Sequence, residues 1–458
     1  MQEEDVRGRR FSILGGARSG VAAAELLVSH GAKVFLSDRN SEQAMASVAA
    51  ELRSMGTEFE FGDNTDRVLD ADMLVVSPGV RSDAPLLQKA IRRGIPVISE
   101  LELASRFCSA PIVAITGTNG KTTTTTLAGR MFADARVPCA VAGNIGTAFS
   151  QVVRSLTAGT VVVLEVSSFQ LDHIATFRPA VAAILNITPD HLDRYEHDFG
   201  RYIASKRRIF ENQGEGDVLI YNADDPVTVE AVGKNPPNGV TLLPFSTRKE
   251  LPQGAFLAGG VVTVAAGGME REIIPASAIS IRGEHNLANS MAAVLAAITR
   301  DVPVASLRAT LKNFKGVEHR LEFVRELDGI TYVNDSKATN VDSVWYALRS
   351  FTAPLIVLMG GRDKGNDYRR LREPVKEHVK TIVAIGESAD KVVAGFAGVV
   401  PTIKAATMES AIAAARGAAA RGDIVLLSPA CASFDWYTDY EHRGRVFKEI
   451  VNALPPMQ

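Results

Sequence analysis

The chain alternates short runs of apolar, often β-branched residues with longer amphipathic stretches along its whole length. In the first block, apolar runs at 11–14, 34–36 and 73–76 predict strands, and residues 21–29 have the pattern of an amphipathic helix. Strands that alternate with helices in this way are typical of α/β proteins with largely parallel sheets. The first block therefore predicts a Rossmann-like unit, which the chain leaves through residues 99–106.

Two further blocks repeat this alternation. The second begins with a predicted strand at 112–116, has strands at 161–166 and 181–185, carries a glycine-rich β insertion at 254–281 and closes with a helix at 286–298. The third block, which predicts a second Rossmann-like unit, has strand patterns at 331–333, 355–358, 382–385 and 424–427.

A glycine-rich segment follows the first strand of the second block and opens a helix. It reads Gly117-Thr118-Asn119-Gly120-Lys121-Thr122-Thr123. In such a loop, backbone N–H groups wrap a phosphate, the lysine reaches the outer phosphates, and the hydroxyl after it can bind Mg²⁺. Its first glycine stands two residues later than in the standard P-loop. The alternative interpretation is a strand-to-helix turn that carries a lysine by chance.

The length of the chain supports a division into domains, because 458 residues are too many for one ordinary hydrophobic core. We predict an α/β protein of three domains. They are a Rossmann-like N-terminal domain at 1–105, a central P-loop ATPase domain with a mostly parallel sheet at 106–316, and a Rossmann-like C-terminal domain at 317–458.

Composition and charge exclude several classes of protein. The net charge of -2 provides no basic field for nucleic acid, and the apolar runs are too short to span a bilayer. No signal-peptide pattern follows the first residues. The three cysteines, Cys108, Cys139 and Cys431, are odd in number and scattered, which favours a reducing compartment over a disulfide framework. We therefore expect a cytoplasmic protein, in which Cys431 is a packed residue rather than a nucleophile.

Charged side chains occur where the predicted strands of the second block end. Glu165 lies in an apolar strand, where a lone carboxylate needs a partner or a cation. His191 follows the next strand, so an acid and an imidazole emerge from neighbouring strand ends, at the edge where α/β proteins hold their sites. Mg²⁺ prefers oxygen ligands, so a histidine is a less usual ligand for it. His191 is therefore either a metal ligand or an ordinary hydrogen-bonded histidine. By periodicity alone, Lys206 is a solvated lysine on an amphipathic helix.

The turn at 15–20 is a weak dinucleotide fingerprint. Ala17 stands where the second glycine of the G-x-G-x-x-G pattern belongs, and Asp38 lies near the position of a ribose-binding acid. Taken alone, this turn leaves a nicotinamide-dependent dehydrogenase open as an alternative.

Several segments together are similar to the Mur ligases, a family of bacterial ATP-dependent amide-bond ligases. They are TGTNGKTT at 116–123, EVSSFQ at 165–170, NITPDHLD at 186–193, GEHN at 283–286 with Asn289, and EHR at 318–320. Their order and spacing agree with the family across essentially the whole chain. The resemblance implies three domains, of which the first binds a UDP-sugar, the second binds ATP and the third binds the incoming amino acid.

The third block is similar to the branch of the family that adds D-glutamate. The similarity rests on NDSKATN at 334–340 and LSPACASFD at 427–435, and GGRDKG at 360–365 replaces the Asp-Asn-Pro-Arg motif of the diaminopimelate-adding enzymes. Folylpolyglutamate synthases share the ATPase core but usually lack a preceding Rossmann-like domain. The resemblance implies ATP-dependent addition of D-glutamate to UDP-N-acetylmuramoyl-L-alanine through an acyl phosphate, in the cytoplasmic stage of peptidoglycan synthesis.

The resemblance also implies roles for individual residues. The catalytic residues would be Lys121, Glu165, His191 and Lys206. Lys206 would react with CO₂ to form a carbamate, and two Mg²⁺ ions would be bound by Thr122, Glu165, His191 and that carbamate. ATP would contact Gly117, Thr118, Asn119, Gly120, Lys121, Thr122, Thr123, Asn289, Arg320 and Asp335. The UDP-sugar would contact Arg18, Ser19, Ser37, Arg39, Ser77 and Asn144, and D-glutamate would contact Lys337, Thr339, Lys364, Ser433 and Phe434.

The partners expected from this interpretation are the small-molecule substrates ATP, UDP-N-acetylmuramoyl-L-alanine and D-glutamate. We expect a monomer that binds no nucleic acid and does not insert into a membrane. Two alternatives remain beside the dehydrogenase: a ligase of the same family that adds a different amino acid, and a nucleotide-binding protein without turnover. The lysines and acids named above argue against the second alternative.

Overall fold

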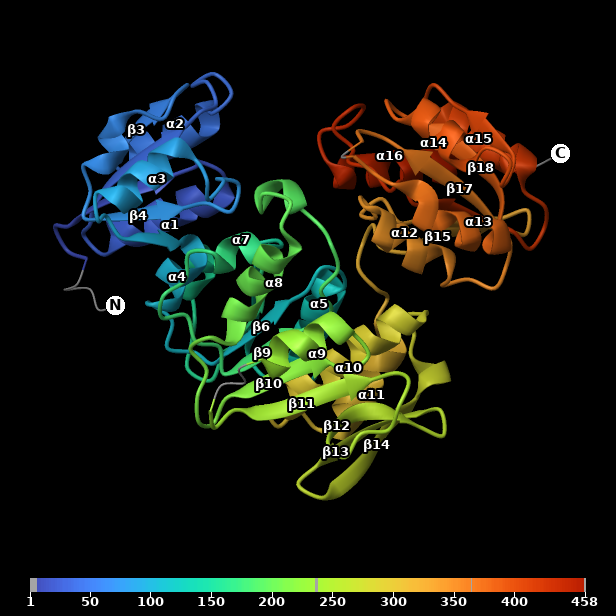
Figure 1. The fold of residues 1–458 in the computed structure, drawn as a ribbon, viewed down its shortest axis with the longest axis horizontal. Helices are drawn as coiled ribbons and strands as arrows, with labels where there is room; N and C mark the ends of the chain where they lie inside the picture. The colour runs from blue at the N-terminus through green and yellow to red at the C-terminus, as the bar shows by residue number, and fades with distance from the viewer. Residues whose placement is uncertain (1–5, 235–237, 364, 457–458) are drawn as a thin grey trace. The chain divides into compact units, whose positions relative to one another are not determined.

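The computed structural model describes residues 6–234, 238–363 and 365–456. The chain divides into two compact units. The first contains the residues up to Ile279 together with Ala288–Asn313, and the second contains Ser280–Leu287 and the residues from Phe314 onward. The described residues form three sheets, two in the first unit and one in the second (Figure 1). The mixed α/β class predicted from the sequence is confirmed.

The first sheet has five parallel strands in the order β3-β2-β1-β4-β5, shown in blue in Figure 1. Strand β1 lies in the middle, with β2 and β3 on one side and β4 and β5 on the other, which is the order of a Rossmann-like sheet. The elements are β1 (Arg10–Leu14), α1 (Arg18–Ser29), β2 (Lys33–Asp38), α2 (Ala46–Ser54), β3 (Glu58–Phe61), η2 (Asp66–Leu69), β4 (Met73–Val76), α3 (Pro85–Arg92), β5 (Val97–Ser99) and α4 (Glu100–Ser105).

The second sheet has nine strands in the order β14-β13-β12-β11-β10-β9-β6-β8-β7. Strands β6 to β12 run parallel to their neighbours in this order, with β8 and β9 paired directly with β6. Strands β12, β13 and β14 pair in antiparallel fashion and form an edge from the predicted glycine-rich insertion. The strands are β6 (Ile112–Thr116), β7 (Cys139–Gly143), β8 (Val161–Glu165), β9 (Val181–Ile184), β10 (Val218–Asn222), β11 (Thr241–Ser246), β12 (Gly254–Ala258), β13 (Val261–Ala266) and β14 (Met269–Pro275).

The helices from α5 to α9 connect the parallel strands, and η5, α10 and α11 follow β14. They are α5 (Lys121–Asp134), α6 (Phe149–Val153), α7 (Ser168–Leu171), η3 (Leu192–Arg194), α8 (Phe199–Arg207), η4 (Arg208–Phe210), α9 (Pro226–Gly233), η5 (Ala276–Ala278), α10 (Glu284–Ile298) and α11 (Val304–Asn313). Strands β6 and β8 are buried along their whole length, as expected for central strands that are covered on both faces.

The third sheet has six strands in the order β15-β16-β20-β17-β18-β19. Only the edge pair β15 and β16 is antiparallel. The elements are β15 (Glu322–Leu327), β16 (Ile330–Asn334), α12 (Val341–Leu348), β17 (Leu355–Gly360), η6 (Tyr368–Leu371), α13 (Arg372–His378), β18 (Val379–Ile385), α14 (Ala389–Phe396), β19 (Thr402–Lys404), α15 (Met408–Ala418), β20 (Ile424–Leu427) and α16 (Tyr440–Ala453). Across the described residues, no helix is both long enough and apolar enough to cross a membrane.

Candidate active site

The predicted phosphate loop connects the central strand β6 to the start of α5. Gly117 and Gly120 both have positive φ, at 155° and 87°, and Gly120 is the N-cap of α5. A Cβ on Gly120 would lie 2.2 Å from Oδ1 of Asn289. Glycine is therefore required at this position for its backbone conformation and for space. The same contact places Asn289, a predicted ATP ligand on α10, directly against the loop.

The segment after β9 holds the loop in shape. Asn186 accepts from the Asn119 N–H through its side-chain oxygen at 2.8 Å and donates back to the Asn119 carbonyl at 3.0 Å. Its own carbonyl accepts from the Thr118 N–H at 2.9 Å. No role for Asn186 could be predicted from the sequence, because a reciprocal amide pair between distant segments leaves no periodic pattern.

Two lysines meet at one carbonyl of the loop. The Nζ atoms of Lys121 and Lys206 both donate to the Gly117 carbonyl, at 2.9 and 2.8 Å. Lys206, on α8, is only 1% exposed, so the interpretation of this residue as a solvated lysine is wrong. Burial and the neighbouring Lys121 lower the pKa of Lys206 well below its usual value, against the opposing charges of Asp190 and other acids. This environment favours the uncharged amine over the ammonium form.

Glu165 ends β8 with one satisfied and one unsatisfied oxygen. Its Oε1 accepts from Nδ2 of Asn144 at 2.8 Å, whereas its Oε2 is buried without a hydrogen-bond partner. A buried carboxylate oxygen that no donor reaches is costly unless a cation binds it. This oxygen is therefore suited to act as a ligand of Mg²⁺. Thr122, another predicted ligand, is buried in the first turn of α5.

His191 follows β9 in the left-handed conformation, with φ at 51°. Its side chain is 46% exposed, its Nε2 lies 3.6 Å from a carboxylate oxygen of Asp190, and its ring meets the Phe169 ring edge-on at 5.2 Å. Strands β8 and β9 flank β6, so Glu165, His191 and the loop all lie at the carboxyl edge of three adjacent strands. That edge is where parallel sheets bind ligands.

A cavity of ≈ 830 Å³ lies beside the first sheet. Five of the six residues predicted to bind the UDP-sugar line it, namely Arg18, Ser19, Arg39, Ser77 and Asn144. Ser37 is not among the lining residues. It is fully buried, and its hydroxyl lies 2.8 Å from carboxylate Oε1 of Glu60 and 2.8 Å from Oδ1 of Asn64, so that it can donate to either acceptor. Ser37 therefore fixes the wall of the cavity, and Asn144 connects the cavity to Glu165.

In the second unit, the predicted D-glutamate residues follow neighbouring parallel strands. Lys337 and Thr339 follow β16, and Ser433 and Phe434 follow β20, which pairs with it. Nζ of Lys337 lies 5.3 Å from the centre of the Tyr440 ring, and Phe434 is 60% exposed. The fifth predicted residue, Lys364, lies outside the described residues.

A buried arginine that the sequence did not indicate supports these two segments. Arg443, on α16, donates to the carbonyls of Ser336 at 2.8 Å and Cys431 at 3.1 Å. Burial lowers the pKa of Arg443 to about 10. Cys431 is itself fully buried, with its sulfur 3.2 Å from Nδ2 of Asn366 and 3.4 Å from the Tyr368 hydroxyl. These contacts support the interpretation of Cys431 as a packed residue.

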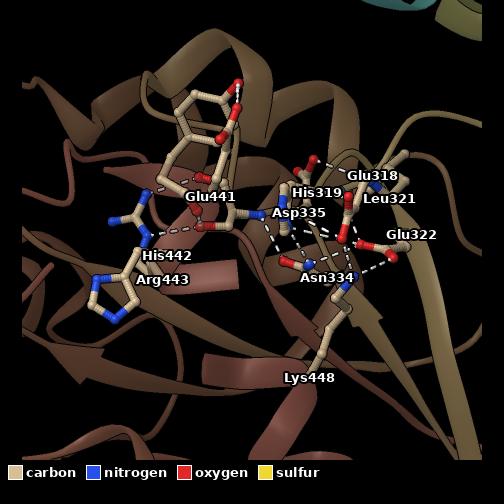
Figure 2. A network of polar contacts seen from close by, with 12 residues as sticks. Glu318, His319, Leu321, Glu322, Asn334, Asp335, Glu441, His442, Arg443 and Lys448 are labelled. Carbon is tan, nitrogen blue, oxygen red and sulfur yellow. Dashed lines mark hydrogen bonds and ion pairs between the residues drawn. The ribbon is translucent and has the colours of Figure 1, made fainter. Parts of the chain in front are cut away.

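Asp335 and Arg320, predicted to contact ATP, lie together in the second unit (Figure 2 shows the surrounding network). Asp335 accepts from the Ser428 hydroxyl at 2.9 Å and from the Leu321 N–H at 3.2 Å. Burial raises the pKa of Asp335 to about 7, although Arg320 opposes this shift. Nε of Arg320 is buried without a hydrogen-bond partner, which suits an oxygen-rich ligand.

Next to them, Asn334 organises a polar network that the sequence did not predict. Its side-chain amide donates to Glu322 at 2.9 Å and contacts Nδ1 of His319, also at 2.9 Å. Lys448 bridges the carboxylates of Glu318 and Glu322 (Figure 2). The network fixes the EHR segment, and with it the backbone that carries Arg320.

Family models match three consecutive parts of the chain. The models are described as Mur ligase MurD-like, N-terminal domain, over residues 9–99, Mur ligase middle domain, over 115–297, and Mur ligase, glutamate ligase domain, over 319–431. The chain belongs to the Mur ligase family. The resemblance stated from the sequence is thereby confirmed.

Among its relatives is the UDP-N-acetylmuramoylalanine–D-glutamate ligase of Salinibacter ruber, with 49% identity over 99% of this chain and 100% of that protein. The enzyme of the same name from Chloroherpeton thalassium is 44% identical, again over 99% of this chain and 100% of that protein. A solved pseudomurein peptide ligase from Methanothermus fervidus has the same fold, with a TM-score of 0.61 and 18% identity over 97% of this chain and 99% of that chain.

Proposed function

We propose that this protein is an ATP-dependent ligase that joins D-glutamate to UDP-N-acetylmuramoyl-L-alanine. The main support for an ATP-dependent reaction is that Lys121 and Lys206 both donate a hydrogen bond to the Gly117 carbonyl of the phosphate loop. The substrates come from the names of full-length relatives that are 44% and 49% identical. The carboxyl-edge positions of Lys337 and Ser433 support a site for a dicarboxylic amino acid, since a cation there suits a carboxylate.

The reaction has two steps. The carboxylate of UDP-N-acetylmuramoyl-L-alanine attacks the γ-phosphorus of ATP, so that a new P–O bond forms and ADP leaves. The amine of D-glutamate then attacks the acyl carbon of the acyl phosphate, a C–N bond forms, phosphate leaves and the amine loses a proton. Lys121 and the N–H groups at the start of α5 stabilise charge on the transferred phosphoryl group, which is electrostatic catalysis without a covalent enzyme intermediate.

Lys206 has the chemistry needed for a carbamate. Burial lowers the pKa of its amine well below the usual value, which favours the uncharged form, the form that is nucleophilic toward CO₂. An N–C bond forms, a proton is released, and a cation becomes an anion beside Lys121. Two Mg²⁺ ions, held by Thr122, Glu165, His191 and this carbamate, would neutralise charge on the phosphates.

The remaining assignments belong to the same proposal. The N-terminal domain at 1–105 would bind the UDP-sugar, the domain at 106–316 would bind ATP, and the domain at 317–458 would bind D-glutamate. All three cysteines are free, which suits the cytoplasm, and we place the protein there as a monomer. Light scattering after gel filtration tests the monomer.

Phosphate release from ATP and Mg²⁺ with UDP-N-acetylmuramoyl-L-alanine tests the function. D-glutamate, L-glutamate, L-alanine, L-lysine or diaminopimelate is added singly, and the product is weighed by mass spectrometry. Release with D-glutamate alone, with one glutamate residue added to the product, is expected. Release with another amino acid would keep the family and refute the D-glutamate assignment, and release with none would favour a nucleotide-binding protein without turnover.

A further inference from the structure

Two arginines tie the wall of the large cavity to the segment that begins at His191. Residues 78–83 follow β4, and Pro78, Gly79 and Arg81 line the cavity. Arg194 donates through Nη1 to the Pro78 carbonyl at 2.8 Å and through Nη2 to the Gly79 carbonyl at 2.5 Å. In the opposite direction, Arg81 donates to the Asp193 carbonyl at 2.8 Å. We call these three hydrogen bonds, made by two arginines, the arginine strap.

The strap reaches His191 through one aromatic ring. The guanidinium carbon of Arg194 lies 4.2 Å from the centre of the Phe169 ring, and the His191 ring meets the same ring edge-on at 5.2 Å. Phe169 is in α7, which begins directly after the Glu165 strand end and its Ser167 N-cap. Arg194 therefore contacts both the backbone of the cavity wall and the ring against which His191 packs.

The backbone of this segment is unusual. His191, Glu196 and His197 all have left-handed conformations, with φ at 51°, 54° and 59°, although none of them is a glycine. L-residues adopt this region rarely, and a segment with three of them keeps its shape only where surrounding contacts fix it. The arginine strap supplies such contacts in the middle of the segment.

We propose that Arg194 is a positioning residue that connects the nucleotide-sugar cavity to His191. This inference rests on the proposed function. A substrate in the cavity fixes the Pro78 and Gly79 carbonyls, the carbonyls fix the guanidinium, and the guanidinium fixes the Phe169 ring that supports His191. Two adjacent acceptors require the planar fork of arginine, whereas lysine satisfies them only as a point charge.

The test compares Arg194→Lys with wild type in the ligase assay. We expect KM for UDP-N-acetylmuramoyl-L-alanine to rise about tenfold, kcat to fall about tenfold, and KM for ATP to stay within about twofold. The melting temperature should not change. Arg201→Lys is the matched control, because Arg201 is exposed and its guanidinium forms ion pairs with Glu196 and Asp198. All constants of this control should remain within about twofold of wild type.

Phe169→Leu separates the arginine strap from His191. It removes the ring between Arg194 and His191, so kcat should fall while the calorimetric affinity for UDP-N-acetylmuramoyl-L-alanine, measured without ATP, stays unchanged. Arg194→Lys should weaken that affinity. The proposal is overturned if Arg194→Lys changes neither constant, or if its loss is equal for ATP and the UDP-sugar and follows a lower melting temperature.

If Arg194→Lys does not fold, Phe169→Leu alone tests the proposal. An unchanged kcat in Phe169→Leu would then refute the proposed connection between Arg194 and His191. If wild type shows no ligase activity, the proposed function fails. The calorimetric comparison of Arg194→Lys with Arg201→Lys, with UDP as the probe, then still tests the strap, and equal affinities would overturn it.

Discussion

The side-chain amide of Asn144 donates to Oε1 of Glu165 over 2.8 Å, and the same Asn144 lines the nucleotide-sugar cavity. One side chain therefore orients the carboxylate whose other oxygen, Oε2, has no protein partner. The close approach of the two strand ends allows this contact, since a Cβ on Gly143 would lie 2.3 Å from the Glu165 carbonyl.

Asn144→Ala should weaken the response to Mg²⁺. The change leaves both Glu165 oxygens without a donor, and loss of a residue that orients a metal ligand typically costs about 10- to 100-fold in metal affinity or activity. Titration of the ligase rate with Mg²⁺ measures the shift. Asn40→Ala is the control, because Asn40 lines the same cavity but follows β2 of the first sheet, whereas Glu165 ends β8 of the second. Equal Mg²⁺ curves for the two variants would contradict the orienting role.

Gly120→Ala should strongly reduce turnover without unfolding the protein. The new methyl group would overlap Oδ1 of Asn289, and φ at 87° is unfavourable for alanine. We expect kcat/KM for ATP to fall about a hundredfold or more, measured by phosphate release. Gly417→Ala provides the comparison: nothing lies within 4 Å of its Cβ position in α15, so its activity should match wild type. Activity in Gly120→Ala near the wild-type level would show that the loop tolerates a side chain.

Lys206→Met should lower the ligase rate about a thousandfold while the protein remains as stable as wild type or becomes more stable. Methionine fills a similar volume, and the Gly117 carbonyl keeps its hydrogen bond from Lys121. The folded-state pKa of Lys206 is lowered, so the unfolded chain binds a proton that the folded chain does not, and wild-type stability rises with pH until the unfolded pKa is reached.

Denaturant unfolding in CO₂-free buffer between pH 7 and pH 10 checks this expectation, since the advantage of methionine should shrink as pH rises. Lys234→Met, a change at an exposed lysine paired with Glu230, should show no such trend. A large loss of stability in Lys206→Met at pH 7 would mean that Lys206 is protonated in the folded protein.

Asp335→Asn should gain stability relative to wild type as pH rises. Burial raises the pKa of Asp335 to about 7, so the stability linked to its proton is present below the unfolded pKa and is lost as pH rises through 7. Asparagine needs no proton and avoids this loss. The difference between the melting temperatures of variant and wild type should therefore widen from pH 5 to pH 8.

Asp367→Asn is the matched comparison for Asp335→Asn. The pKa of exposed Asp367 is lowered to about 2, chiefly by the hydrogen bond from the Arg369 side chain, so its contribution is lost only at acid pH. Its melting-temperature difference should be constant from pH 5 to pH 8. A constant difference in Asp335→Asn as well would show that Asp335 is ionised across this range.

The sequence predicted those strands whose apolar character is continuous. The runs at 73–76, 112–116 and 424–427 coincide with β4, β6 and β20, because central strands of a parallel sheet are buried on both faces. Strand β3 was missed. It reads Glu-Phe-Glu-Phe at the edge of its sheet, and a short alternating run of this kind has no distinct signal without its neighbour.

The candidate site was predictable only in part. The phosphate loop could be predicted because its glycines stand between a strand pattern and a helix pattern. The five cavity residues were predicted through the family resemblance. The burial of Lys206 was not predictable from periodicity, because it depends on how α8 packs against a loop far away in sequence. The roles of Asn186, Ser37 and Arg443 were missed for the same reason, since each contacts segments distant in the chain.

The antiparallel insertion also determines how the central sheet ends. Strand β14 forms its outer edge, and Glu270, Arg271 and Glu272 are exposed there in succession. Edge strands offer unpaired backbone groups to other chains, and charged side chains along an edge discourage such pairing. The insertion therefore protects a nucleotide-binding sheet, rich in aggregation-prone apolar strands, from edge-to-edge association at high protein concentration.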